Sequence, residues 1–298
     1  MIRLSGSFVL HLNSGCLLVS GGEILYNLII NLEKRDIMAT NYGFSLKWMA
    51  VTSFEMRFGN TTVVSDPFIT ECDQTDLTWE DVENCDMICL SHAHWDHITD
   101  IPRLAAKFQP KILCGEQTAL LMARWLNYNG TFVYPMYPDT ELDFGDVKIR
   151  SLYGRHTNLH AGLNDLTERI NKNEFCQADP GMAALQELGS FEYRNYLFTL
   201  PNGVKILIWG NNPTVEQINL CKAIAPDIAI IQRSVKPEEI AEKAEFAAQI
   251  GCKVLIPHHH DFRHKESPET IPMFRDEFLK RVPDGVFIEP KHGEWIHL

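Results

Sequence analysis

Three histidines and an aspartate fall within six consecutive positions of CLSHAHWDHITD, residues 89–100. The segment continues the apolar run DMICL, and a strand that ends there would deliver polar groups to a loop, where sites commonly form. Alternate side chains of an extended chain share a face, so His92 and His94 can reach one cation together. Asp96 and His97 follow in the turn and can hold a second cation. Imidazole and carboxylate ligands in this mixture suit zinc or a similar divalent metal.

Metal ions bound in this segment would supply a reactive water. A divalent cation lowers the pKa of bound water from ~15.7 to near 7, and it polarises a carbonyl or phosphoryl oxygen. Asp96 can both ligate the metal and accept the proton as the water attacks, so we predict that it is the general base. Hydrolysis of a lactone, an ester, an amide or a phosphodiester would use the same apparatus, and the metal site alone does not choose among them.

Short apolar runs and helical patterns alternate from about Leu46 to the end of the chain. SLKWMAVTSFEMRFGNTTVVSDPF reads as two or three strands with a turn at Gly59-Asn60, and YRNYLFTLPNGVKILIWG reads as a hairpin that turns at 201–203. Further strands are predicted at DMICLSH, PKILCG, DIAIIQ, CKVLIP and GVFIEP, with helices at 213–224, 236–250 and 268–281. Strands precede helices in both halves, which favours sheets covered by helices on their outer faces.

The segment SHAHWDH resembles the signature of the metallo-β-lactamase superfamily. That family has an α/β fold, an αββα four-layer sandwich of two mixed β-sheets packed face to face with helices on both outer faces, and a two-metal site at one edge. The resemblance implies that Asp66 in VVSDPF orients a ligand histidine. It also implies that His156 in GRHT completes the first metal site and that His259 in LIPHHHDF joins the second. The full predicted set of metal ligands is His92, His94, Asp96, His97, His156 and His259.

One branch of the superfamily resembles the chain further, because the closing PKHGEW is similar to its terminal strand. This branch contains L-ascorbate-6-phosphate lactonase and related metal-dependent hydrolases. The chain departs from it at two places. Asn211 in WGNNP occupies the position at which the family places an aspartate that bridges both metals, so the second site could be weaker, absent or filled by a different metal. Ala50 and Val51 replace a Gly-His pair, and whatever that histidine does in relatives is missing.

The organised chain is predicted to be a single metallo-β-lactamase-like domain, residues 38–298, with residues 1–37 as an N-terminal appendage of undefined role. Residues 158–192 break the rhythm of strands and helices, and we expect a partly helical insertion there. Because this insertion follows GRHT, it should overhang the metal edge and shape the substrate pocket. The apolar residues expected to line that pocket are Phe175, Met182 and Phe191.

Several other polar residues lie near the proposed ligands in sequence. His258, His260 and Asp261 flank His259, and each could hold a ligand histidine in place or line the pocket. For Asp261, a solvated loop acid is an equal alternative. The candidates for binding a substrate are Arg155, His160 and Arg233. Surface arginines are common, so an ordinary surface role stays open for both arginines.

Composition narrows the class of partner. The net charge of −12 argues against a long nucleic acid, because phosphate binding needs a basic surface. The 8 cysteines include no CxxC pair, and in a chain of this length they favour a reduced, cytoplasmic protein. No apolar run approaches the ~18–20 residues of a transmembrane helix. We therefore expect a small-molecule substrate and no membrane partner, with homo-oligomerisation left open.

The sequence thus predicts a metal-dependent hydrolase that uses a metal-activated water on a small ester-type substrate, and the resemblance favours a lactone. One or two Zn²⁺ ions are the expected cofactor, with Mn²⁺ or Fe²⁺ as alternatives. Two other functions remain open. One is a phosphodiesterase of the same superfamily acting on a small or cyclic phosphodiester. The other is a non-catalytic metal-binding protein, which Asn211 would permit.

Overall fold

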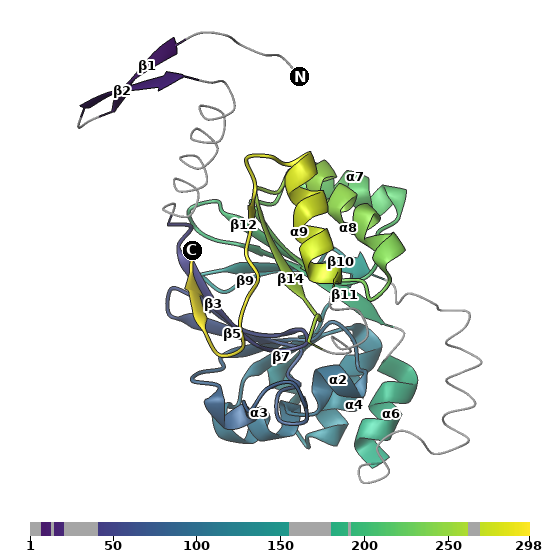
Figure 1. Cartoon of the computed structure of the whole chain (residues 1–298). Coiled ribbons are helices and arrows are strands. Elements are labelled where there is room, and N and C mark those ends of the chain that lie inside the picture. Colours follow the sequence, from purple (N-terminus) through teal and green to yellow (C-terminus); the bar gives the residue numbers. More distant parts are fainter. Residues whose placement is uncertain (1–6, 13–14, 21–40, 155–179, 190–191, 262–268) are drawn as a thin grey trace.

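Two seven-stranded β-sheets form the centre of the molecule in the computed structural model, which describes residues 7–12, 15–20, 41–154, 180–189, 192–261 and 269–298 (Figure 1). The first sheet has, in order, β16 (Trp295–His297), β3 (Phe44–Ala50), β4 (Ser53–Phe58), β5 (Thr61–Ser65), β6 (Met87–Cys89), β7 (Lys111–Cys114) and β8 (Val133–Pro135). The second has β15 (Val286–Phe287), β14 (Val254–His258), β13 (Ile228–Gln232), β12 (Lys205–Trp209), β11 (Tyr193–Thr199), β10 (Lys148–Gly154) and β9 (Glu141–Asp143). Both sheets are mixed, because each contains parallel and antiparallel pairs.

Helices cover the outer face of each sheet (Figure 1). The helices outside the first sheet are α2 (Trp95–Ile98), α3 (Ile101–Phe108), α4 (Glu116–Trp125) and α6 (Pro180–Gly189). Those outside the second sheet are α7 (Val215–Ile224), α8 (Pro237–Gln249) and α9 (Thr270–Arg281). Two 3₁₀ turns, η1 (Trp79–Asp81) and η2 (Gly130–Phe132), complete the described helical elements. None of the described helices is both long enough and apolar enough to cross a membrane.

Alternate residues of the strands belong to different apolar layers. In β6, Met87 and Cys89 pack in the core between the two sheets, whereas Ile88 packs in the cluster under α3 and α4. In β13, Ile230 faces the other sheet, and Ile231 packs in the cluster with α7, α8 and α9. This alternation follows from the two-residue period of a strand whose two faces are both buried. Three apolar layers therefore separate four structural layers, and the predicted αββα sandwich is confirmed.

Parallel strands bring their carboxyl ends to one edge of each sheet. β5 to β8 run parallel in the first sheet, and β12 to β15 run parallel in the second. β6 ends just before the histidine segment, and β14 ends at His258. Loops at the carboxyl ends of parallel strands are where open α/β sheets place their ligand sites.

Most of the elements predicted from the sequence are present. The turn at Gly59-Asn60 joins β4 to β5, β11 and β12 form the predicted antiparallel hairpin, and α7, α8 and α9 lie within the predicted helical ranges. The N-terminal segment contributes β1 (Ser7–Leu12) and β2 (Gly15–Ser20), which pair with each other in a separate two-stranded sheet. Its role stays a prediction. Six of the described cysteines are free and buried, namely Cys72, Cys85, Cys89, Cys114, Cys221 and Cys252.

The described part of the predicted insertion is α6, and it differs from the expectation. Met182 and Leu185 are buried in the cluster under α4, and the backbone carbonyl of Gly189 accepts a hydrogen bond from Ala93 N at 3.1 Å. The prediction that Met182 lines the substrate pocket is therefore wrong, because an apolar helical face was available to pack against α4. Phe175 and Phe191 lie outside the described residues.

Candidate metal centre

A cavity of about 120 Å³ lies where strand ends of the two sheets meet. β6, β12, β13 and β14 end beside it, and β11 begins there. The residues that line the cavity are His92, His94, Asp96, His97, Tyr193, Asn211, Gln232 and His259. The structure thus brings together five of the six residues that the sequence predicts as metal ligands. The sixth, His156, lies outside the described residues.

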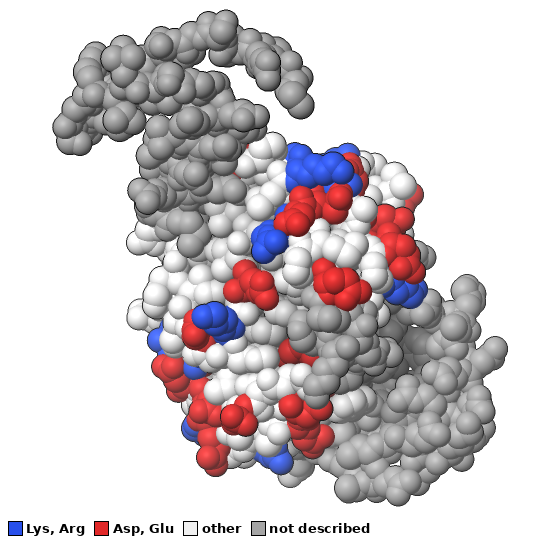
Figure 2. Space-filling model, in the orientation of Figure 1, with Lys and Arg blue, Asp and Glu red and all other residues white. Residues whose placement is uncertain are grey.

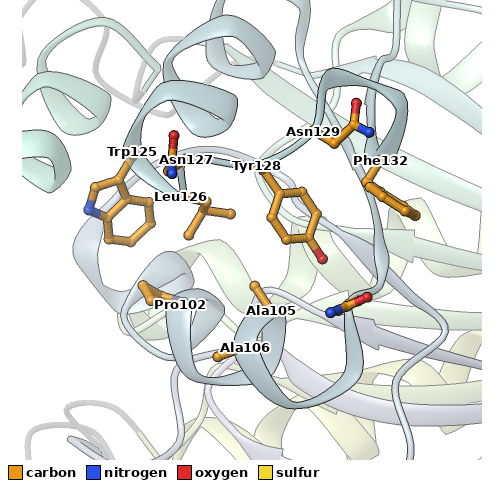
Figure 3. Close-up of a pocket in the computed structure, with 10 residues that line it drawn as sticks. Pro102, Ala105, Ala106, Trp125, Leu126, Asn127, Tyr128, Asn129 and Phe132 are labelled. Carbon is orange, nitrogen blue, oxygen red and sulfur yellow. The ribbon is translucent and has the colours of Figure 1, made fainter.

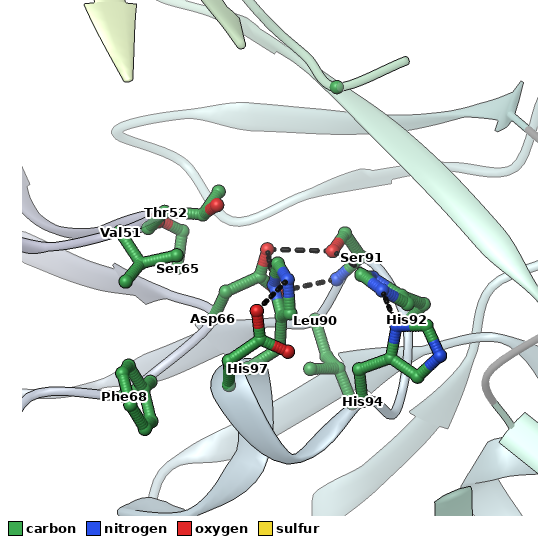
Figure 4. Close-up of polar contacts among 12 residues, drawn as sticks. Val51, Thr52, Ser65, Asp66, Phe68, Leu90, Ser91, His92, His94 and His97 are labelled. Carbon is green, nitrogen blue, oxygen red and sulfur yellow. Dashed lines mark hydrogen bonds and ion pairs between the residues drawn. The ribbon is translucent and has the colours of Figure 1, made fainter. Parts of the chain in front are cut away.

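His92 and His94 point ring nitrogens at the same place. His92 Nε2 lies 2.8 Å from His94 Nδ1, and His92 Nδ1 lies 3.0 Å from the hydroxyl of Ser91 (Figure 4). Two imidazole nitrogens at this separation either share a proton or direct both lone pairs to one cation. The arrangement follows from the extended backbone of residues 92–94, in which alternate side chains share a face.

A second group of ligand atoms lies beside the first. One ligand atom from each of Asp96, His97 and His259 falls within 4.8 Å of the other two. Asp96 Oδ2 lies 3.8 Å from His97 Nε2 and 3.7 Å from His259 Nε2. Such spacings are expected around one divalent cation, whose bonds to nitrogen and oxygen are ~2.0–2.2 Å long. The donor set therefore fits a metal ion.

Asp66 fixes the orientation of His97. Its carboxylate accepts hydrogen bonds from Ser91 N at 2.6 Å and Ser91 Oγ at 2.7 Å (Figure 4). Its Oδ2 also lies 3.0 Å from His97 Nδ1, which leaves His97 Nε2 to face the cavity. A carboxylate behind the imidazole selects the tautomer of a ligand histidine and raises its basicity. This is the position that the resemblance implied for Asp66.

Opposing effects shift the pKa values of the second group of ligands. Burial acts to raise the pKa of Asp96, but His97, His259 and His94 outweigh it and hold that pKa below its ordinary value. Burial acts to lower the pKa of His97, but Asp96 and Asp66 raise it above the ordinary value. For His259, burial prevails and lowers the pKa. The cavity therefore presents an ionised carboxylate beside imidazoles, and this pairing attracts a cation.

A strained turn holds His259 in place. His259 has a φ of 58° and donates its backbone N–H to Val51 O at 2.8 Å. Val51 has a φ of 50°, and its own N–H donates to Asp261 Oδ2 at 2.8 Å. Left-handed backbone is costly for a β-branched residue and persists where the surroundings impose it, often at functional sites. The β3–β4 turn at Val51 and Thr52 therefore positions the loop after β14.

The remaining residues predicted near His259 support this loop. His260 stacks on Trp48 with ring centroids 4.2 Å apart, and Asp261 Oδ2 lies 3.0 Å from His292 Nε2. Asp261 is buried, so the solvated alternative is wrong. His258 is also buried, and its Nε2 lies 3.1 Å from a backbone carbonyl of β12.

Arg233 lies beneath the same loop. Its guanidinium donates to His260 O at 3.1 Å and to Thr270 Oγ1 at 3.2 Å, and the side chain is 2% exposed. It is not among the residues that line the cavity. Substrate binding by Arg233 stays a prediction. In the structure, Arg233 links the loop after β14 to the start of α9. Arg155 and His160 lie outside the described residues.

Sequence reasoning missed Tyr193 and Gln232, which also line the cavity. Gln232 is a polar residue at the carboxyl end of a parallel buried strand, and that position was a signal for it. Tyr193 faces Gly154 across the β10–β11 ladder, and its ring centroid lies 4.8 Å from that of His92. No local pattern marks Tyr193, because its place depends on the pairing of β10 with β11.

A larger cavity elsewhere lacks the chemistry of hydrolysis. It has a volume of about 520 Å³ and lies between α3 and the end of α4 (Figure 3). Trp125, Tyr128 and Phe132 line it together with the amides of Asn127 and Asn129. No carboxylate or imidazole occurs among its lining residues. Size alone therefore does not identify the candidate site.

A buried lysine contacts the backbone next to the cavity-lining Asn211. Lys243 of α8 is 4% exposed and donates from Nζ to Gly210 O at 2.9 Å. Burial lowers the pKa of Lys243 to about 7, and Glu239 opposes this shift only in part. In the unfolded chain, the ammonium keeps its proton up to about pH 10.4. Between these two pKa values the unfolded state binds more protons, so stability rises with pH there.

We expect Lys243→Met to remove this pH dependence. The free energy of unfolding of the wild type should rise, relative to the variant, by roughly 1 kcal/mol per pH unit between pH 7 and 9. Urea denaturation of metal-free protein at pH 7, 8 and 9 measures the difference. The loss of the bond to Gly210 O shifts the variant by a constant amount, so the slope is the informative quantity. Equal slopes for both proteins would contradict the lowered pKa of Lys243.

We expect Asp66→Asn to weaken metal binding by roughly 10–100-fold, because the amide cannot hold His97 as a carboxylate does. Titration of the metal-free protein with Zn²⁺ measures the change, and circular dichroism checks that the fold is retained. The control is Asp76→Asn, which changes an exposed aspartate and should bind Zn²⁺ as the wild type does. Unchanged affinity in Asp66→Asn would show that Asp66 does not act on a metal ligand.

Known proteins resemble the chain in sequence and in fold. A model of the β-lactamase superfamily domain matches residues 61–172. A UPF0173 metal-dependent hydrolase from Geobacillus sp. (strain WCH70) is 27% identical over 242 residues, which are 80% of this chain and 92% of that protein. Igni18, a metallo hydrolase from Ignicoccus hospitalis, has a TM-score of 0.63 at 13% identity and covers 85% of this chain and 97% of its own.

A second solved structure of the same fold is named for a different chemistry. CmlA, a diiron β-hydroxylase from Streptomyces venezuelae, has a TM-score of 0.55 at 14% identity, over 97% of this chain and 66% of that one. The two structural likenesses show the fold alone, while the domain model covers the histidine segment. Taken with the αββα sandwich, these matches show a metallo-β-lactamase fold whose residues 61–172 resemble the β-lactamase superfamily domain.

Proposed function

We propose that this chain is a metal-dependent hydrolase that acts on a small ester-type substrate, with a lactone favoured. One observation carries the proposal. His92, His94, Asp96 and His97 come from the segment after β6, and His259 comes from the loop after β14 in the other sheet, yet all five line a single small cavity. The Geobacillus relative, named a metal-dependent hydrolase, supports the same class of activity. The preference for a lactone rests on the similarity of PKHGEW to the lactonase-containing branch.

The cavity would hold the metal with two groups of ligands. His92 and His94 would belong to the first, with His156 as its predicted third member, and Asp96, His97 and His259 would form the second. A bound divalent cation would supply an acidified water and a Lewis acid for the substrate oxygen. Zn²⁺ is the proposed metal, because the donors are imidazoles and one carboxylate. The diiron centre of CmlA keeps Fe²⁺ as an alternative, and Mn²⁺ is a further one.

Residues of the chain would accept the proton and position the metal ligands. Asp96 would accept a proton from the attacking water, since its lowered pKa keeps it ionised near neutral pH. Asp66 would hold His97 in one tautomer through the 3.0 Å contact to Nδ1. The strained turn at Val51 would keep His259 directed at the cavity through its hydrogen bond to His259 N. These groups are fixed before substrate arrives, and such preorganisation favours catalysis.

Asn211 supports a second candidate function. It lines the cavity as a neutral amide at the position where the family places a bridging aspartate. A carboxylate binds a divalent cation more strongly than an amide does, so the chain could hold one metal without turnover. A small or cyclic phosphodiester is the alternative substrate for an active enzyme. The lactone hydrolase, the phosphodiesterase and the non-catalytic metal-binding protein predict different outcomes in the same experiment.

The proposed partner is a small molecule rather than a long nucleic acid. The net charge is −12, and Figure 2 shows acidic and basic side chains interspersed on one face of the molecule. A long nucleic acid requires a continuous basic surface. A cytoplasmic location is also proposed, because six of the described cysteines are free and buried.

Elemental analysis joined to a parallel activity screen tests the proposal. Purified protein should contain one or two equivalents of a divalent metal and should hydrolyse members of a panel of lactones, with a chelator abolishing activity. Hydrolysis of phosphodiesters only would move the function to the alternative enzyme class. A tightly bound metal without turnover on either panel would support the binding protein. Absence of metal after supplementation with Zn²⁺, Mn²⁺ and Fe²⁺ would overturn the hydrolase.

A further inference from the structure

The segment that carries Asn211 is fixed by hydrogen bonds on its backbone. Gly210 N donates to Asn195 Oδ1 at 2.9 Å, and the Trp209 indole donates to Asn211 O at 2.8 Å. His258 Nε2 lies 3.1 Å from Trp209 O. Polar groups of three successive residues are thus held by the Trp209 indole and by side chains of β11 and β14. The direction of the Asn211 Cα–Cβ bond is therefore set by the fold.

Two further contacts restrict the segment. Lys243 Nζ donates to Gly210 O at 2.9 Å. Tyr193 packs so closely on Gly210 that a Cβ atom there would lie 1.7 Å from Tyr193 Oη. Only glycine permits this approach, because any side chain would collide with the buried phenol. Asn211 therefore has little freedom to turn away from the cavity.

The Asn211 amide itself lacks a partner among the residues that the structure describes. The side chain is 4% exposed, it lines the cavity, and neither Oδ1 nor Nδ2 makes a hydrogen bond there. A buried amide without partners costs free energy, and most such groups are paired in native proteins. A rigid, buried amide directed into a polar cavity points to a bound species that satisfies it.

The charge of the cavity favours a negatively charged species. Asp96 is the one carboxylate among its lining residues, and Tyr193, Asn211 and Gln232 are neutral polar groups. With one divalent cation bound, the metal and Asp96 together carry a net charge of about +1, and with two they carry about +3. An amide Nδ2 donates hydrogen bonds, which a carboxylate at the same place could not do. The loaded cavity therefore attracts anions and offers them a donor.

We propose that Asn211 is an anion-binding residue, whose Nδ2 donates to a negatively charged oxygen of the substrate or product held beside the metal. This inference rests on the proposed metal-dependent function and narrows it to substrates that carry, or yield, a carboxylate or phosphate oxygen. With asparagine at position 211, the cavity binds a second cation more weakly and an anion more strongly. With aspartate there, it would bind a second cation more strongly and an anion more weakly.

Three variants separate this role from others. Asn211→Ala removes the donor and the acceptor, and Asn211→Asp keeps the shape but replaces the donor with a charge. Asn212→Ala is the matched control, because this neighbouring asparagine is not among the cavity-lining residues. Each protein is titrated first with Zn²⁺ in the metal-free form and then, once loaded, with inorganic phosphate as the anionic probe. Calorimetry measures both steps without an activity assay.

The expected pattern differs between the variants. Phosphate should bind the loaded wild type and the Asn212→Ala control equally, within about twofold. Asn211→Ala should weaken phosphate binding by roughly 10–100-fold, the usual effect of one hydrogen bond to a charged group. Asn211→Asp should weaken phosphate binding at least as much and should bind a second equivalent of Zn²⁺ more tightly. Asn211→Ala should gain no such Zn²⁺ affinity.

The two steps fail in distinguishable ways. If the wild type binds no Zn²⁺, the metal-dependent function and the anion site fall together. If it binds Zn²⁺ but phosphate binds Asn211→Ala as well as the wild type, only the role of Asn211 is overturned. Failure of the loaded wild type to bind phosphate would also overturn it. Tighter phosphate binding by Asn211→Asp would assign this residue to the cation rather than to the anion.

Discussion

Asp96→Asn is expected to lower the rate of hydrolysis by about 10³-fold, within the range usual for loss of a general base. Asp96 is the one carboxylate among the residues lining the cavity, and its Oδ2 lies 3.8 Å from His97 Nε2 and 3.7 Å from His259 Nε2. The amide keeps the shape but cannot accept the proton from water at neutral pH. It is also a poorer metal ligand, so metal content should fall together with the rate.

The measurement combines initial rates on the best substrate of the screen with metal analysis of the same sample. Asp276→Asn is the control, since that side chain is exposed on α9 and its ion pair is on the surface; it should retain full activity and metal. If Asp96→Asn keeps its metal and loses only rate, the proton-accepting role predominates. Full activity in Asp96→Asn would remove this residue from the mechanism.

The sequence could predict Asp96 and its neighbours because their spacing is local. His92 and His94 share a face of an extended segment, so their ring nitrogens meet without help from distant parts of the chain. His259 was assigned through resemblance rather than through local geometry, and the structure places it 3.7 Å from Asp96. The metal-binding role of all these residues stays a prediction, although their convergence on one cavity is a property of the fold.

Residues whose positions depend on long-range pairing could not be assigned in the same way. Asp261 follows the histidines directly, but its carboxylate meets Val51 N, because the β3–β4 turn docks on the loop after β14. Lys243 lies in AEKAEF, a pattern typical of a solvated helix face, yet it is buried against Gly210. Hydrophobic periodicity describes one element at a time, and these contacts arise where two elements close on each other.

The other large effect is expected from Gly210→Ala, which adds one methyl group against Tyr193, a residue that lines the cavity. The new Cβ would lie 1.7 Å from Tyr193 Oη and 2.6 Å from its Cζ, far closer than any van der Waals contact. Tyr193 is buried, and Gly210 is held through both its N–H and its carbonyl. Neither side can move freely, so we expect the free energy of unfolding to fall by about 3 kcal/mol, the upper end for overpacked cores.

Thermal and urea denaturation of the metal-free protein measure the loss, which should lower Tm by roughly 5–10 °C. Gly130→Ala is the matched control, because a Cβ there meets nothing within 4 Å; it should change stability by less than about 0.5 kcal/mol. Adding Tyr193→Phe removes the hydroxyl, so the double variant should lose less stability than the sum of the single changes. Strict additivity would show that the phenol and Gly210 do not touch.

Because the same contact sets the direction of Asn211, Gly210→Ala should also weaken phosphate binding by the loaded protein, whereas Gly130→Ala should not.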